Sequence, residues 1–113
     1  HKQFTPFSQM RKIEQQMNSA IRNRVNFSSS NTAVRHGFEG EADVYLHGNH
    51  IATVMQNSII IKDGGWQSNT TKSRLNALLD EFAYGMRVIQ RDFVWYLDDR
   101  FGKTVDFISG MTV

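Results

Sequence analysis

Apolar residues recur every three or four positions near the start of the chain, which is the spacing of one face of an α-helix. Pro6 suits the first turn of such a helix, and Thr5 or Ser8 can cap it. The apolar positions are Phe7, Met10, Ile13, Met17, Ala20 and Ile21. The pattern therefore predicts a helix over residues 6–24 that packs through this face.

After a polar loop at residues 27–31, the pattern changes to the two-residue alternation of β-strands, which is clearest at residues 41–47. Gly48 and Asn49 fit a two-residue hairpin turn, because glycine accepts the positive φ that such turns need. The alternation predicts an antiparallel meander. Its strands are expected at residues 32–36, 41–47, 51–56 and 59–62.

A second helical pattern begins near Thr70 or Thr71, either of which can cap it, and Gly85 can end it in the left-handed conformation. Its apolar face consists of Leu75, Leu78, Leu79, Phe82 and Ala83. Strand patterns then return, with Phe93 and Trp95 on one side of a strand and Trp95 expected in the core. These last strands are predicted at residues 87–90, 93–97 and 104–108.

The order of these elements predicts an α+β fold, α-β-β-β-β-α-β-β-β, in which two helices pack on one antiparallel meander sheet. A chain of 113 residues, 40% of them hydrophobic, can bury a core as a single domain. We expect one domain over residues 1–113. It consists of a basic amphipathic helix in residues 1–25 and a sheet with one internal helix in residues 32–108.

Composition removes several classes of protein. The chain has no cysteine, so disulfides, a thiol nucleophile and cysteine-based zinc sites are excluded. It contains no run of about 20 apolar residues, as a membrane helix requires, and its first seven residues lack the order of a secretory signal. These features predict a cytoplasmic protein with no membrane partner.

Charge is unevenly distributed along the chain. The first 24 residues hold five cations and one anion, a net +4, whereas the rest holds eight cations and ten anions, a net −2. The early cations are Lys2, Arg11, Lys12, Arg22 and Arg24. Such asymmetry is typical of a helix that meets nucleic acid or an acidic partner, and equally of a helix docked on its own acidic body.

The start of the second helix is the best candidate for a binding site. A helix N-terminus exposes unpaired N–H groups and the positive end of the dipole, which Asp or Glu normally offsets. Lys72 and Arg74 occupy these early positions instead, beside the hydroxyls of Thr70 and Thr71, so the segment predicts an anion site. Trp66, just before it, could stack on a base. The alternative is an ordinary cap, a core tryptophan and two solvated cations.

No enzyme or metal site is predicted. His47 and His50 flank the hairpin turn, but a metal would need a further ligand from Asp43 or His36, and paired polar residues at a hairpin end are the commoner explanation. Neighbouring Asp98 and Asp99 are expected in a turn. The residues therefore indicate no cofactor, no metal and no catalytic group.

Tyr45 lies on the sheet face opposite Leu46 by alternation. With a cation nearby it could stack on a base of a single strand, although the sequence motifs of the common RNA-binding domain are absent.

Two segments resemble a family of small proteins encoded by tailed bacteriophages. One is the hairpin Leu-His-Gly-Asn-His-Ile-Ala at residues 46–52, and the other is Trp66 followed by Thr-Thr-Lys-Ser-Arg-Leu-Asn-Ala-Leu at residues 70–78. The resemblance covers about residues 41–97. It implies a phage protein in the cytoplasm of an infected bacterial host, and no catalytic residues.

Three functions follow as hypotheses. The first is binding of nucleic acid or another polyanion through the basic helix and the start of the second helix. The alternative is inhibition of a host protein, such as a defence nuclease or RNA polymerase, by occlusion through the Phe/Met-rich stripe of the first helix, which could also form a homodimer. The third is a metabolite-binding sponge that uses the anion site.

Overall fold

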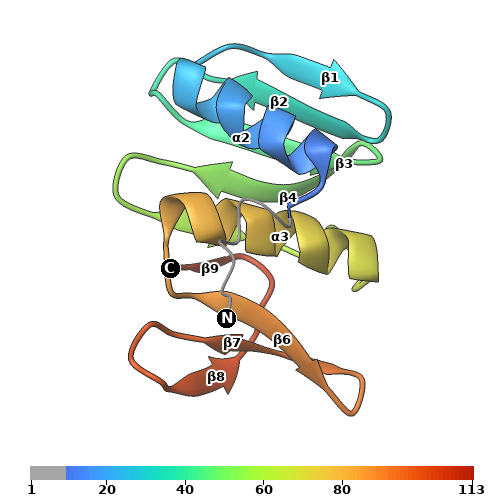
Figure 1. Cartoon of the computed structure of the whole chain (residues 1–113), viewed down its shortest axis with the longest axis vertical. Coiled ribbons are helices and arrows are strands. Elements are labelled where there is room, and N and C mark those ends of the chain that lie inside the picture. Colours follow the sequence, from blue (N-terminus) through green and yellow to red (C-terminus); the bar gives the residue numbers. More distant parts are fainter. Residues whose placement is uncertain (1–9) are drawn as a thin grey trace, which may run out of the picture.

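The computed structural model describes residues 10–113, in which two helices and nine strands confirm the α+β class (Figure 1). None of the helices in this part of the chain has the length and hydropathy needed to span a bilayer. The elements in chain order are α2 (Lys12–Asn23), β1 (Phe27–Ser29), β2 (Thr32–His36), β3 (Ala42–Leu46), β4 (Asn49–Val54), β5 (Ile59–Ile61), α3 (Asn69–Phe82), β6 (Arg87–Arg91), β7 (Val94–Asp98), β8 (Thr104–Asp106) and β9 (Met111–Thr112).

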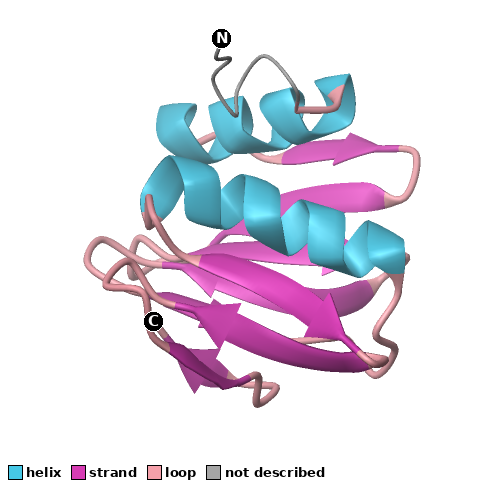
Figure 2. Cartoon of the chain, turned by 60° about the horizontal axis from the view of Figure 1, so that its bottom comes forward, coloured by secondary structure: helices cyan, strands magenta, loops and turns pink. Residues whose placement is uncertain are grey.

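The strands form two antiparallel sheets rather than the single predicted meander. Six strands lie in the order β1-β2-β3-β4-β5-β9, and β6-β7-β8 form the second sheet. Both helices pack on the same side of the strands (Figures 1 and 2). The short strands β1 and β9 were not predicted, because β1 lies in a polar run and β9, paired with β5, has only two residues.

The core lies between the two helices and the inner face of the six-stranded sheet. Val34, Val44, Ala52 and Ile61 face one another across four neighbouring strands, and all four are buried. The apolar face of α3 contributes three fully buried leucines, as its spacing predicted, and α2 contributes Met17. The apolar positions given by the helix and strand periodicities are therefore buried in the same core.

A β-bulge shapes β4. Val44 pairs with Ala52 and Tyr45 pairs with His50, so Ile51 is the extra residue. As a result, His50 and Thr53 project to the outer face of the sheet although three positions separate them. The preceding turn is formed by His47 and Gly48, both at positive φ (53° and 79°), one residue earlier than predicted.

The helix ends differ from those predicted. Helix α2 begins at Lys12, so residues 10 and 11, which were predicted helical, are not. Arg11 is the N-cap residue, and its side chain makes no capping bond. The predicted start and caps at residues 5–8 lie outside the described residues. Ser68, not Thr70 or Thr71, caps α3 by accepting a 3.1 Å bond from the backbone of Thr71. Sequence places all three hydroxyls close together, and only the backbone decides which one caps.

The second sheet completes the core at the other end of the molecule. Trp95 is buried, as predicted, and its ring meets that of Phe107 edge-on at 5.2 Å. Phe93, predicted on the same side as Trp95, lies instead in the β6–β7 turn at φ 69° and is 90% exposed. The turn breaks the alternation one residue before β7 begins.

Asp80, in the last turn of α3, provides a test of electrostatics within this fold. Desolvation by burial raises the pKa of its carboxyl above the ordinary 3.8, and attraction to Arg87 only partly offsets this. A raised folded-state pKa means that the fold is more stable while Asp80 is protonated and loses that stability as the pH rises through this pKa. The helix dipole also disfavours a negative charge here.

We therefore expect Asp80→Asn to raise the free energy of unfolding at pH 7 by about 0.5 kcal/mol. The gain should vanish below pH 3.8, where the wild-type carboxyl is protonated in both states. Urea titrations at pH 7 and at a pH below 3.8 measure the difference in the free energy of unfolding. An equal gain at both would show that charge is not the cause.

Candidate functional site

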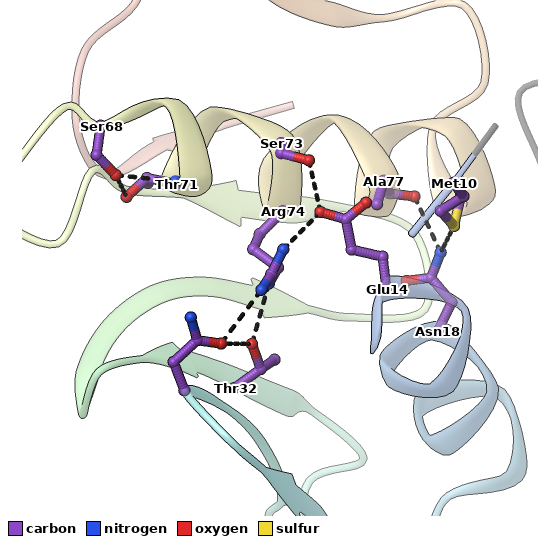
Figure 3. Close-up of polar contacts among 10 residues, drawn as sticks. Met10, Glu14, Asn18, Thr32, Ser68, Thr71, Ser73, Arg74 and Ala77 are labelled. Carbon is purple, nitrogen blue, oxygen red and sulfur yellow. Dashed lines mark hydrogen bonds and ion pairs between the residues drawn. The ribbon is translucent and has the colours of Figure 1, made fainter. Parts of the chain in front are cut away.

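Arg74 lies inside the protein and not at an anion site. Its side chain is 4% exposed, and its Nη1 donates to Glu14 Oε2 at 2.7 Å. Nε donates to Thr32 at 3.0 Å (Figure 3), and Nη2 donates to Asn31 at 3.2 Å. The prediction that Arg74 awaits an external anion is therefore wrong, because the domain's own acid neutralises it.

Glu14 is the residue that sequence reasoning missed. Its Oε2 also accepts a 2.6 Å bond from the hydroxyl of Ser73, so α2 is tied to α3 by two residues of α3 (Figure 3). The partners of the ion pair are 60 positions apart in the sequence. The available signal was that Glu14 is the single acid among the first 24 residues, on the buried side of an otherwise basic helix.

The other residues predicted at the start of α3 are only partly brought together. Trp66 is 77% exposed, so it is not a core tryptophan, and it lines a cavity of about 160 Å³ with Thr70 and Thr71. Lys72 donates to Gln90 of β6 at 3.0 Å and does not line that cavity.

An acid also lies at this helix start. Asp63 lines the same cavity, and its carboxylate accepts bonds from the backbone of Gly65 at 2.8 Å and the side chain of Gln67 at 3.3 Å. A carboxylate beside the positive end of α3 offsets the potential that an anion would use. Anion binding by Trp66, Thr70, Thr71 and Lys72 stays a prediction, with less support than the sequence suggested.

The cations of the basic helix lie at its two ends. Arg11 and Lys12 are exposed at the start of α2. Arg22 lies near its end, where Nη1 forms a 2.6 Å ion pair with Glu81 while the side chain stays 43% exposed. Arg24 follows as the left-handed C-cap and is exposed. The ten positions between Lys12 and Arg22 correspond to about 15 Å along the helix axis.

A groove of about 490 Å³, whose exposed lining is mostly apolar with polar side chains along α2, runs between α2 and the approach to β1. We call it the α2–β1 groove. Its lining from α2 is Lys12, Gln15, Gln16, Ser19, Ala20 and Arg22, and from the following segment Val25, Asn26 and Phe27. Among the described residues, no carboxylate lines it. The groove thus combines two cations with three amide side chains, a set that binds phosphate oxygens.

The outer face of the six-stranded sheet carries a hydrogen-bonded row of side chains. The Thr53 hydroxyl donates to Asp43 at 2.7 Å, so its oxygen accepts from Nε2 of His50 at 2.8 Å. Lys62 then donates to Nδ1 of His50 at 3.4 Å. The ring of Tyr45 lies 5.4 Å from that of His50, tilted by 38°. In residues 10–113, neither helix lies on this face (Figure 2).

The structure brings together only some of the ligands considered for a metal at the hairpin, with Nε2 of His50 3.4 Å from Oδ1 of Asp43. His47 is exposed in the turn, His50 belongs to the row just described, and His36 bonds to the backbone oxygen of Val25 at 3.0 Å. No group of three or more His, Asp or Glu residues suited to a metal ion occurs between residues 10 and 113.

The fold and this surface define a small α+β protein with a groove beside α2 that no carboxylate of residues 10–113 lines. The family described as Kyanoviridae Gp96 protein matches residues 10–113, and the chain belongs to this phage protein family. The phage origin implied by the resemblance is confirmed. The family match extends beyond the expected residues 41–97 to include the basic helix and the C-terminal end. No curated protein and no solved structure gives a significant match.

Proposed function

We propose that this phage protein acts by binding and not by catalysis, and that it binds nucleic acid along the α2–β1 groove in the cytoplasm of the infected host. The observation that carries the proposal is the composition of the groove. Lys12 and Arg22 lie at its ends, amide side chains lie between them, and no carboxylate from the described chain lines it. Such cations attract phosphates, and the acid nearest to them is Glu81, which pairs with Arg22 at one end of the groove.

The dimensions of the groove support a run of phosphates. About 15 Å along the helix axis between Lys12 and Arg22 lets the two side chains contact different phosphates of one strand. Arg22 is paired with Glu81, but the pair is exposed and contributes little to stability. A phosphate can therefore replace Glu81 as the partner of Arg22 at small cost.

The test is a titration of the full chain with labelled single-stranded and duplex 20-mers, followed by fluorescence anisotropy from about 50 to about 200 mM salt. We expect affinity to fall steeply with salt because cation–phosphate contacts release counterions. The double variant Lys12→Gln/Arg22→Gln should bind about tenfold more weakly at low salt, with a log–log salt slope shallower by about 1.5.

A matched control is Arg100→Gln/Lys103→Gln, which removes the same charge from the exposed β7–β8 turn, away from α2 (Figure 1). This control should retain most of the affinity. Absence of binding to every nucleic acid at low salt would overturn the proposal, as would an equal loss in the two double variants.

The alternative is occlusion of a host protein, and the hairpin β6–β7 favours it. Phe93 is almost fully exposed at its tip and Val94 is half-exposed beside it. The stripe of the first helix supports this role less, since Met17 and Ile21 are buried in the protein's own core. A pull-down that recovers a stoichiometric host protein, lost on Phe93→Ser, would favour this function. The homodimer and the metabolite sponge stay predictions.

A further inference from the structure

We propose that the outer face of the six-stranded sheet holds a second binding site, which stacks one unpaired base on Tyr45 and holds its phosphate with Arg35. This inference rests on the proposed function and deepens it, because a site of this kind selects single strands over duplexes. The ligand unit is a nucleotide.

The site is an open groove of about 530 Å³ on strands β1, β2 and β3 and their turns, which we call the outer groove. Its volume is in the range of pockets that hold small organic ligands. Its lining includes Tyr45, Arg35, Asn31, Ser28 and His47. Within the described chain, no carboxylate lines the groove, but Asp43 lies opposite Arg35 in the register of β2 and β3 and partly offsets its charge.

The register of the strands leaves one side of Tyr45 open. Ser28, Ala33 and Tyr45 are paired across β1, β2 and β3, and His50 follows on β4. Tyr45 therefore has a second ring on one side and two small side chains on the other. A serine and an alanine leave room for a flat ligand beside the tyrosine, which larger side chains would fill.

Hydrogen bonds hold the neighbouring ring in place. His50 is held between Thr53 and Lys62, and Thr53 is in turn bonded to Asp43. In this arrangement Nε2 faces the Thr53 hydroxyl and Nδ1 faces the ammonium of Lys62. Tyr45 and His50 thus form a supported aromatic surface beside the cation of Lys62, and such surfaces stack bases regardless of sequence.

The buried ion pair orients one of the side chains that line the outer groove. Arg74 and Thr32 both donate to Oδ1 of Asn31, which fixes the amide at the β1–β2 turn. The Nδ2 group of Asn31 is then left as a donor at the lining of the groove. An oriented amide donor is suited to a base edge or a phosphate oxygen. Arg35, which is exposed on β2, supplies the positive charge for the phosphate.

The two grooves lie on either side of the edge strand β1. Phe27 lines the α2–β1 groove and its neighbour Ser28 lines the outer groove. A flexible single-stranded nucleic acid can pass over β1, which is short, and occupy both grooves. A duplex cannot bend so sharply, because its persistence length is about 150 bp. The arrangement therefore predicts preference for single strands.

The experiment measures affinity for a dT12 strand, a 12-bp duplex and free thymidine monophosphate, at low salt. Tyr45→Leu should weaken binding of dT12 by about 10- to 100-fold and leave duplex binding unchanged, because one stacked base is lost. Tyr45→Phe should retain the affinity. Tyr96→Leu, which removes a partly buried tyrosine from the second sheet, is the matched control and should have no effect.

Photocrosslinking of the wild-type chain to a strand that carries 5-iodouracil provides a readout that needs no variant, and the crosslink should map to Tyr45. Crosslinks confined to other residues, or equal dT12 affinity of Tyr45→Leu and Tyr96→Leu, would overturn the inference. If the α2–β1 variants weaken binding while Tyr45→Leu does not, this inference alone fails. If neither strand nor duplex binds, the proposed function fails. Tyr45-dependent binding of free nucleotide as tight as that of dT12 would support the site and identify its ligand as the monomer.

Discussion

Replacing Arg74 by methionine should lower the free energy of unfolding by about 3–5 kcal/mol, a large part of the stability of a domain of this size. The variant removes the partner of Glu14, whose side chain is 4% exposed. A buried carboxylate without a counter-charge is strongly disfavoured, and Thr32 and Asn31 would each lose the bond from the guanidinium as well. Urea denaturation followed by tryptophan fluorescence measures the loss.

Two further variants separate the charge effect from packing. Glu14→Met/Arg74→Met removes both charges, and we expect it to recover much of the lost stability, because a buried ion pair contributes little net free energy over apolar residues of similar volume. Arg22→Met is the matched control. It breaks an ion pair of similar length, 2.6 Å, that is exposed, and it should cost at most about 1 kcal/mol. If Arg74→Met costs no more than Arg22→Met, the buried pair does not stabilise α2 against α3.

The Arg74 result shows where sequence reasoning about this chain reached its limit. An arginine six residues after a helix cap can be a solvated cation, a ligand of an anion or one partner of a buried ion pair. The choice depends on Glu14, which approaches only when α2 packs on α3. A pair whose residues are so far apart in the sequence cannot be recognised from local patterns, whereas a helix or a strand can.

The elements that were predicted correctly are those whose cause is local. The alternation of β2 to β5 and the leucine spacing of α3 follow from burial of one face, which the sequence records directly. The bulge at Ile51 and the two-residue strand β9 depend on pairing with distant strands, so no local pattern announces them. The division into two sheets has the same origin, since it depends on which strand edges meet.

The candidate sites follow the same division. The basic helix was visible as a charge asymmetry, and two of its cations, Lys12 and Arg22, line a groove. The contacts of Arg22 with Glu81 and of Glu14 with Arg74 also fit the other reading, a helix docked on its own domain. The outer groove was visible only in part, as Tyr45 on the face opposite Leu46. Its other members come from β1, β2 and two turns, and the register that unites Ser28, Ala33 and Tyr45 exists only in the folded sheet.

Asn76 should be the second position at which a single substitution has a large effect. Its side chain donates to the carbonyl of Val88 at 3.0 Å and accepts from the backbone N–H of the same residue at 2.7 Å. Val88 lies on β6, an edge strand of the second sheet, and is buried. The Asn76 amide therefore replaces a neighbouring strand and attaches the second sheet to α3.

Asn76→Ala should lower the free energy of unfolding by about 2–5 kcal/mol, because two buried backbone groups lose their partners at about 1–3 kcal/mol each. Asn76→Asp keeps the shape but brings a carboxylate oxygen to the Val88 carbonyl, so it should be at least as destabilising at pH 7. Asn23→Ala, at an exposed helical asparagine bonded only to Ser19, is the control and should change stability by less than about 0.5 kcal/mol. Hydrogen exchange of the β6–β7 amides should accelerate selectively in Asn76→Ala, since the lost bonds anchor that sheet. If these amides remain as protected as in the wild type while global stability falls, the second sheet is held by its apolar contacts and not by Asn76.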